Sequence, residues 1–103
     1  MITINPLEVN GNQFIAVRVA LPKTNLLTIS NDVGYIMCAA LDVDVFDANE
    51  KLREREVIAG RASGVRTIDD LLHAPLQKIT NAAKDKYGWK EGMIGKDALL
   101  KLT

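Results

Sequence analysis

The sequence predicts an α+β domain of two layers, in which a mostly antiparallel sheet of about five strands is covered by three to four helices. Two observations lead to this prediction. Short β-type segments separated by tight turns fill residues 1–41, whereas residues 42–103 carry helix signals with one further strand among them. Strands that come first and helices that come later are typical of α+β folds. At 103 residues, we expect the whole chain, 1–103, to form a single domain.

The first two strands are predicted from alternation and from one turn. Ile2 and Ile4 alternate with polar residues, and Pro6 follows them. Because proline has no N–H to give to a neighbouring strand, this segment is either a strand at the sheet edge or a strand with a break. The Asn-Gly pair at residues 10–11 predicts a hairpin turn, since both residue types tolerate a positive φ angle. We expect the second strand at residues 14–21.

Two more strands follow, each after a turn. Residues 22–25 and 31–34 are rich in Pro, Asn, Asp and Gly, so they predict turns and leave strands at residues 26–30 and 35–41. The fourth strand is apolar on both faces, which places it at the centre of the sheet. One face would carry Ile36, Cys38 and Ala40, and the other would carry Met37, Ala39 and Leu41.

The second half of the chain is predicted to begin with a helix and a fifth strand. Asp42 or Asp44 can cap a helix that ends in the charged run at residues 51–56, which we interpret as a solvent-facing surface. The short apolar segment at residues 57–62 is the fifth strand. Because this strand follows a helix, it would lie parallel to the fourth strand through a right-handed crossover.

Helices are predicted to complete the chain. Thr67 can cap the next helix through its hydroxyl, and Asp70, three residues later, completes a capping box. Pro75 suits the first position of a helix, which predicts a helix over residues 76–87, and the glycine that follows is a typical C-cap. A terminal helix would occupy residues 96–102.

The composition gives no support to several classes of partner. The 13 Lys and Arg residues balance the 13 Asp and Glu residues, so the chain lacks the basic surplus that nucleic-acid and membrane-surface binding usually leaves, and we expect neither partner. This neutrality also removes charge repulsion between copies of the chain. One cysteine excludes an intrachain disulfide and suits a reducing compartment, and one Cys with one His cannot build a structural zinc site. With no signal peptide and no apolar run of membrane length, we expect a cytoplasmic protein without metal or other cofactor.

The most concentrated charge-binding chemistry lies in the segment that leads into the third helix. This candidate ligand site consists of Arg61, Ser63, Gly64, Arg66 and Thr67. Two guanidinium groups beside the N–H groups of a helix start can hold a carboxylate or a phosphate. The alternative is structural, with the glycines allowing a sharp turn and each arginine paired with an acidic residue. Asp69 and Asp70 follow Arg66 closely, so Arg61 is the arginine that better suits a ligand.

Cys38 and His73 are the remaining reactive side chains. A nucleophilic cysteine needs a base and a lowered pKa, and His73 is the single histidine available. The alternative is that Cys38 is a small buried hydrophobic residue and that His73 lies at a helix end. We therefore favour a non-catalytic protein, and we keep open a small enzyme whose site is completed at a subunit interface with Cys38. A buried Cys38 without a polar neighbour would exclude that enzyme.

Several segments together resemble one protein family. They are GYIMCAALD at residues 34–42, AGRASGVRTI at 59–68, LLHAPL at 71–76, LPKTN at 21–25 and GMIGKDAL at 92–99. In their order they resemble the YunC-like family of small bacterial and archaeal proteins of unknown function. The resemblance implies an α/β fold whose N-terminal β region mediates tetramer formation. Because that family has no assigned reaction, the resemblance supplies no catalytic residue.

The N-terminal strands also predict self-association on their own. Residues 2–21 carry more apolar side chains than one small sheet can bury, and they begin at a sheet edge. We expect a closed homo-oligomer joined through this region, with a tetramer favoured over a dimer. A small anionic ligand bound near residues 60–66 is the second functional expectation.

Overall fold

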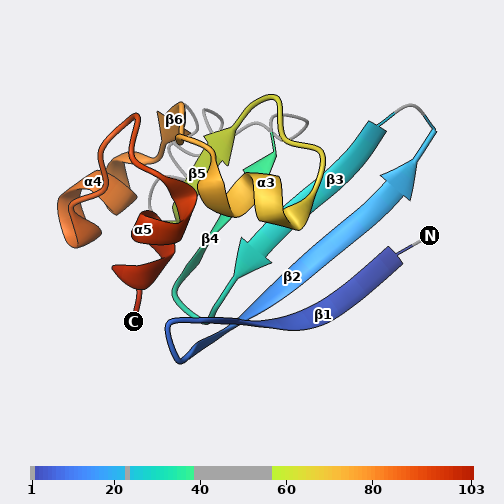
Figure 1. Ribbon diagram of the computed structural model, residues 1–103. Coiled ribbons are helices and arrows are strands. Elements are labelled where there is room, and N and C mark those ends of the chain that lie inside the picture. The colour runs from blue at the N-terminus through green and yellow to red at the C-terminus, as the bar shows by residue number, and fades with distance from the viewer. Residues whose placement is uncertain (1, 23, 39–56) are drawn as a thin grey trace.

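The computed structural model describes residues 2–22, 24–38 and 57–103, which form one sheet with helices on it (Figure 1). The six strands are β1 (Ile2–Val9), β2 (Asn12–Leu21), β3 (Thr24–Ser30), β4 (Gly34–Cys38), β5 (Ile58–Ala62) and β6 (Lys78–Ile79). The helices in the described ranges are α3 (Ile68–His73), α4 (Asn81–Tyr87) and α5 (Gly95–Leu100). The strands lie in the sheet in the order in which the chain forms them, and all neighbours are antiparallel except β4 and β5. This architecture confirms the predicted α+β fold.

The hairpin of β1 and β2 forms as the sequence predicts. Asn10 and Gly11 both have a positive φ angle, 51° and 83°, which is the conformation of a two-residue turn that matches the twist of its strands. The register runs without a break from Val9 opposite Asn12 to Ile2 opposite Val19. Pro6 therefore lies inside a continuous strand, and β1 is the edge of the sheet.

The centre of the sheet is buried on both sides, as expected for β4. Ile36 and Cys38 belong to the main core beneath the helices, together with Leu27 of β3. Met37 points to the opposite side, where it is buried with Ala59, and Tyr35 and Val57 pack on them. Burial on that side raises the pKa of the Tyr35 phenol. We call the side of Met37 and Ala59 the outer side of the sheet, and the other the helix side.

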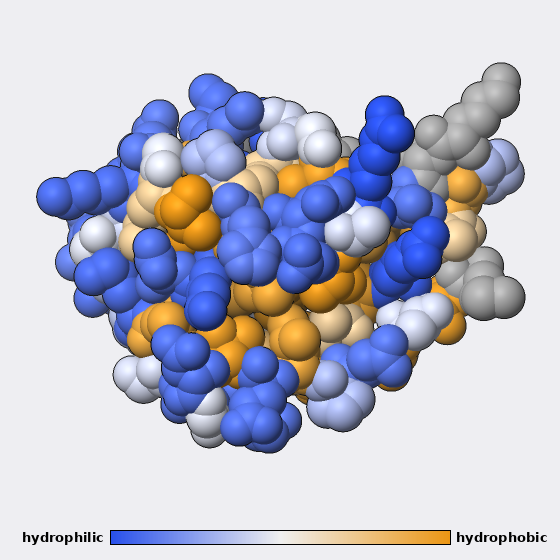
Figure 2. Space-filling view, viewed as in Figure 1, coloured by the Kyte–Doolittle hydropathy of each residue, from blue (hydrophilic) through white to orange (hydrophobic). Residues whose placement is uncertain are grey.

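The helix side is covered by short helices that pack on the central strands. α3 packs on β3, β4 and α5, while α5 also packs on β4 and α4 packs on β5. Figure 2 shows this face, with hydrophilic side chains over most of the helices and apolar side chains visible between them. No helix in the described ranges has the length and apolar character needed to cross a membrane.

β5 is parallel to β4, with Gly34 opposite Ile58 and Cys38 opposite Ala62, which confirms the predicted pairing. The two strands approach closely at Gly34, where a Cβ atom would lie 2.6 Å from the carbonyl oxygen of Ile58. The predictions for Ala39–Leu41 and for the Asp42- or Asp44-capped helix, with its charged run, concern residues 39–56, which lie outside the described residues.

The predicted helix over residues 76–87 is wrong in its first five residues. Residues 76–80 are not helical: Gln77 lies in a bend, Lys78–Ile79 form β6, and the helix α4 begins at Asn81. Thr80 explains the difference, because its backbone and its hydroxyl bind the neighbouring strand β5. Its N–H donates to the carbonyl oxygen of Ala59 (3.0 Å), and its Oγ1 donates to that of Val57 (2.6 Å). Long-range pairing thus overrides the local helix signal of Pro75, whose fixed φ angle also suits an extended chain.

The caps of the other helices agree with the sequence. The Thr67 hydroxyl accepts the N–H of Asp70 (3.0 Å), while a carboxylate oxygen of Asp70 accepts the N–H of Arg66 (3.1 Å). This is the expected reciprocal capping, displaced by one residue on its return bond. Gly88 ends α4 in the left-handed conformation, with a φ angle of 68°. α5 begins one residue earlier than expected, at Gly95, and ends at Leu100.

Candidate functional site

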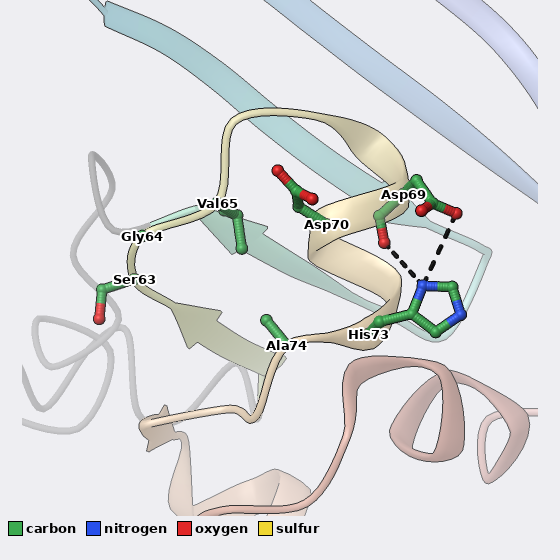
Figure 3. Close-up of a pocket in the computed structure, with 7 residues that line it drawn as sticks. All are labelled: Ser63, Gly64, Val65, Asp69, Asp70, His73 and Ala74. Atoms are coloured by element: carbon green, nitrogen blue, oxygen red, sulfur yellow. Dashed lines mark hydrogen bonds and ion pairs between the residues drawn. The ribbon is translucent and has the colours of Figure 1, made fainter.

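The turn from β5 into α3 borders a shallow, open depression of about 400 Å³ (Figure 3). Its lining residues are Ser63, Gly64, Val65, Asp69, Asp70, His73 and Ala74. Gly64 allows the chain to reverse there, since its φ angle of 77° is one that side chains rarely adopt. Two residues of the predicted ligand site, Ser63 and Gly64, therefore border a real concavity, and neither of the two arginines lines it.

The polar groups of this depression are acidic. Asp69 and Asp70 occupy the first turn of α3, and His73 occupies its last turn. The Nδ1 atom of His73 lies 2.9 Å from the backbone oxygen of Asp69 and 3.6 Å from its carboxylate, as the dashed lines of Figure 3 show. The Asp69 side chain is 85% exposed and that of His73 is 59% exposed, so this ion pair is a surface contact.

Ser63 belongs to the rim of this depression. Its hydroxyl donates to the side-chain oxygen of Gln77, and in Figure 3 it points away from the other labelled residues. The depression as a whole presents carboxylates and an imidazole, which suit cations and hydrogen-bond donors better than an anion. Within the described residues, no group of three or more His, Cys, Asp or Glu side chains could hold a metal ion.

The structure places the two arginines of the predicted site on different parts of the fold. Arg61 lies in β5 between Gly60 and Ala62, both of which face the core on the helix side. Because side chains alternate along a strand, Arg61 shares the outer side with Ala59. Arg66 is exposed in the turn before Thr67, the cap of α3. The two guanidinium groups therefore do not converge on the start of α3.

Arg61 has a neighbour of the same charge that the sequence did not reveal. Lys78 of β6 is the direct partner of Arg61 in the antiparallel register, and its neighbour Ile79 is buried in the main core. Lys78 therefore points to the outer side, as Arg61 does. No sequence signal identified Lys78, because the segment around it was predicted to be helical. Arg61 is half-buried, its Nε atom is fully buried, and the side chain already has an interaction partner.

Cys38 is a buried residue in a satisfied environment. It is 3% exposed, and its Sγ accepts the N–H of Leu27 (3.4 Å) and contacts the backbone oxygen of Asn25 (3.5 Å). Its polar contacts among the described residues are backbone groups, and none of them is a base. His73 makes its contact with Asp69 instead. The described residues thus give no support to a Cys38–His73 pair, and an enzyme completed at a subunit interface stays an untested prediction.

A second feature is apolar and lies on the outer side of β1 and β2. Ile15 and its alternate neighbours point away from Phe14 and Ala16, which are core residues of the helix side. We call this surface the outer strand face, and it consists of Ile2, Ile4 and Pro6 from β1 and Ile15, Val17, Val19 and Leu21 from β2. Ile2 and Ile4 are each 65% exposed, Ile15 is 50% exposed and Leu21 is 45% exposed.

Comparison with known proteins places the chain in a family. Residues 37–102 match the family described as a domain of unknown function, DUF1805, and this match covers more than half of the chain. The chain belongs to the DUF1805 family. The uncharacterized protein YunC of Bacillus subtilis (strain 168) is 56% identical over 102 residues, which cover 99% of this chain and 98% of that protein.

A solved structure confirms the fold of this DUF1805 protein. The crystal structure of a protein of unknown function, TA1206 from Thermoplasma acidophilum, matches with a TM-score of 0.85 and 28% sequence identity. The match covers 100% of this chain and 94% of that chain. The resemblance to the YunC-like family is therefore confirmed. The names of these relatives assign no ligand, reaction or assembly.

The DUF1805 match divides the candidate features into two groups. It begins at Met37, so Cys38, Arg61, Lys78 and the depression of Figure 3 lie inside the matched range. The outer strand face lies entirely before it, in β1 and β2.

Proposed function

We propose that this protein is a cytoplasmic homo-oligomer whose subunits are joined through the outer strand face, with a tetramer favoured over a dimer. The observation that carries this proposal is the position of the exposed apolar side chains. Of the five large hydrophobic side chains that are exposed in the described ranges, four belong to this one face: Ile2, Ile4, Ile15 and Leu21. Contiguous exposed apolar surface of this kind marks an interaction site more often than a solvent-facing surface.

A second copy of the chain is the partner that fits this face. The centre of the face, from Ile2 to Pro6 and from Ile15 to Leu21, carries no charged side chain on the outer side. The chain as a whole is neutral, so copies do not repel one another. A depression of about 290 Å³ borders Pro6 and Ile15 at one end of the face, and its lining also includes the polar residues Gln13, Ser30, Asn31 and Asp32.

The test is the mass of the particle in solution. Size-exclusion chromatography with light scattering at micromolar concentration should give a closed multiple of the 11.3 kDa chain. Ile4→Glu places a charge in the middle of the outer strand face and should reduce the particle to the monomer. Thr3→Glu is the matched control, because Thr3 is an exposed neighbour on the opposite side of the same strand. A monomeric wild-type protein would refute the proposal.

We propose in addition that a small anionic ligand binds at Arg61, and a specific observation favours this location over the start of α3. Arg61 and Lys78 are direct cross-strand partners on the outer side of β5 and β6. A guanidinium and an ammonium group on the same side of a strand pair both attract an anion and can both donate charge-assisted hydrogen bonds to it. By contrast, the depression beside Thr67 carries Asp69 and Asp70.

Thermal unfolding with inorganic phosphate and citrate tests this second proposal. A bound anion raises the melting temperature by mass action, so stabilisation should increase with ligand concentration. Lys78→Ala should weaken that stabilisation, and Arg66→Ala should leave it unchanged. Loss of stabilisation in Arg66→Ala alone would instead place the ligand at the start of α3. No stabilisation of the wild-type protein by either anion would refute the ligand.

A further inference from the structure

We infer that Pro6 blocks the open edge of β1 against strand addition, so that copies of this chain pack face to face and not edge to edge. The inference rests on the proposed homo-oligomer, whose partner is a second copy of the chain. It adds that this copy packs on the outer strand face and does not pair with the backbone of β1. It concerns a specific weakness of the fold: β1 is an edge strand of eight residues, and one of its sides pairs with nothing in the described sheet.

The register determines which backbone groups face that open edge. A two-residue turn makes Val9 and Asn12 a hydrogen-bonded pair, and bonded pairs then recur at every second position of the hairpin. Leu7, Asn5 and Thr3 consequently direct their N–H groups toward β2. The residues between them direct their backbone groups toward the open edge, namely Ile2, Ile4, Pro6 and Glu8.

Pro6 therefore lies at an outward position, where its effect on a foreign strand is greatest and its cost to the hairpin is smallest. Because the missing N–H of Pro6 would not have bonded to β2, the hydrogen bonds between β1 and β2 stay complete and β1 continues through Pro6 without a break. At the open edge it removes the donor between Ile4 and Glu8 and places a ring there. An incoming strand would leave an acceptor unsatisfied at this point, which costs free energy when the group is buried.

Without such a block, this edge has the features of an aggregation site. It is long, and Ile2 and Ile4 at its outward positions are each 65% exposed. Proline and charged side chains are the devices by which proteins blunt such edges, and the outward set contains both, in Pro6 and Glu8. The apolar side chains of the same residues lie on the outer strand face. Burial of that face against the same face of a second copy hides them without using the backbone of the edge.

Pro6→Thr is the decisive variant, because it restores a backbone donor and introduces a residue with high β propensity. The matched control is Ile15→Thr, which changes the residue directly opposite Pro6 on the same face and leaves the edge donors as they are. Light scattering and thioflavin T fluorescence over days should show growth beyond the closed oligomer for Pro6→Thr only. Circular dichroism establishes that both variants fold. If Pro6→Thr keeps the wild-type mass and binds no thioflavin T, the inference is wrong.

Hydrogen exchange of the wild-type protein gives an independent test. The amides of Ile2, Ile4 and Glu8 should exchange faster than those of Asn5 and Leu7, by on the order of a hundredfold, because open edge groups face water. Protection of Ile4 and Glu8 equal to that of Leu7 would show a strand on the edge and overturn the inference. These results can be distinguished from a failure of the proposed oligomer. A monomeric wild-type protein would refute the oligomer, whereas the behaviour of Pro6→Thr would still decide whether Pro6 blocks the edge.

Discussion

The two ends of the sheet differ in how their outer strands are held and in how much apolar surface they leave exposed. At one end, β1 and β2 are joined by a two-residue turn, and their outer side is left apolar and exposed. At the other end, β5 and β6 are separated by a helix and are held by a side chain, Thr80, that is 1% exposed. The first end is built from local signals and leaves apolar side chains exposed. The second is built from long-range contacts and is completed within the subunit.

This difference predicts where a substitution changes the stability of the subunit and where it changes assembly. The β1–β2 end should respond to substitution mainly through the mass of the oligomer. The centre and the β5–β6 end should respond mainly through the free energy of unfolding. Three substitutions outside the β1–β2 hairpin test the second of these expectations, and the one that should cost the most stability comes first.

Ile36→Ala should have the largest effect on stability. Ile36 is fully buried in the main core, and truncation of such a side chain leaves a cavity that costs about 2–5 kcal/mol. Urea unfolding followed by circular dichroism measures this loss. Val33→Ala serves as the control, because Val33 is 40% exposed and lies outside the outer strand face. A loss below about 0.5 kcal/mol for Ile36→Ala would mean that β4 is not a central strand.

Thr80→Val should have an intermediate effect at the β5–β6 end. The substitution keeps the shape of the side chain and removes an Oγ1 that donates to Val57 and accepts from the N–H groups of Ala59 (3.3 Å) and Ala83 (3.4 Å). Buried backbone groups that lose such a partner cost about 1–3 kcal/mol. Thr80→Ser retains the hydroxyl and should lose less stability in the same unfolding experiment. Equal losses in both variants would assign the role of Thr80 to packing.

The surface pair of Lys84 and Glu91 should have the smallest effect. Its hydrogen bond (2.8 Å) and the charge of Lys84 lower the pKa of the Glu91 carboxyl from 4.5. A lowered carboxyl pKa stabilises the folded state above the unfolded pKa, and this contribution is lost as the pH falls through the folded pKa. Glu91→Gln should therefore melt slightly below the wild-type protein at pH 7, and the difference should disappear in acid. A difference that persists in acid would contradict this assignment.

The sequence predicted those elements whose signals are local. The turn at Asn10, the cap at Thr67 and the left-handed Gly88 each depend on residues within a few positions, and each is found in the structure. The buried fourth strand was predictable because both of its faces are apolar. Cys38 in that strand was correctly interpreted as a candidate for burial, since a small side chain in an apolar strand seldom meets water.

The rest could not be predicted because it depends on contacts between distant segments. Pro75 is a helix-start signal in isolation, but Gln77 and Thr80 donate their N–H groups to β5, which keeps the segment extended. The position of Arg61 on the outer side follows from the register of β5, which its local sequence does not encode. Lys78 could not be predicted as the neighbour of Arg61, because the two residues are brought together only by the pairing of β6 with β5.

The coincidence of strand order with chain order has a consequence for how this protein folds. Each antiparallel neighbour from β1 to β4 follows its predecessor within a few residues, so these pairings close short loops. The β4–β5 pairing joins Gly34 to Ile58 and closes a much longer loop, which carries a larger entropic cost. Pulse-labelled hydrogen exchange should accordingly protect the β1–β2, β2–β3 and β3–β4 pairings before the β4–β5 pairing. This order predicts that the exposed apolar hairpin forms during synthesis while the second half of its own chain is still absent, so that the surface proposed for assembly exists before the subunit is complete.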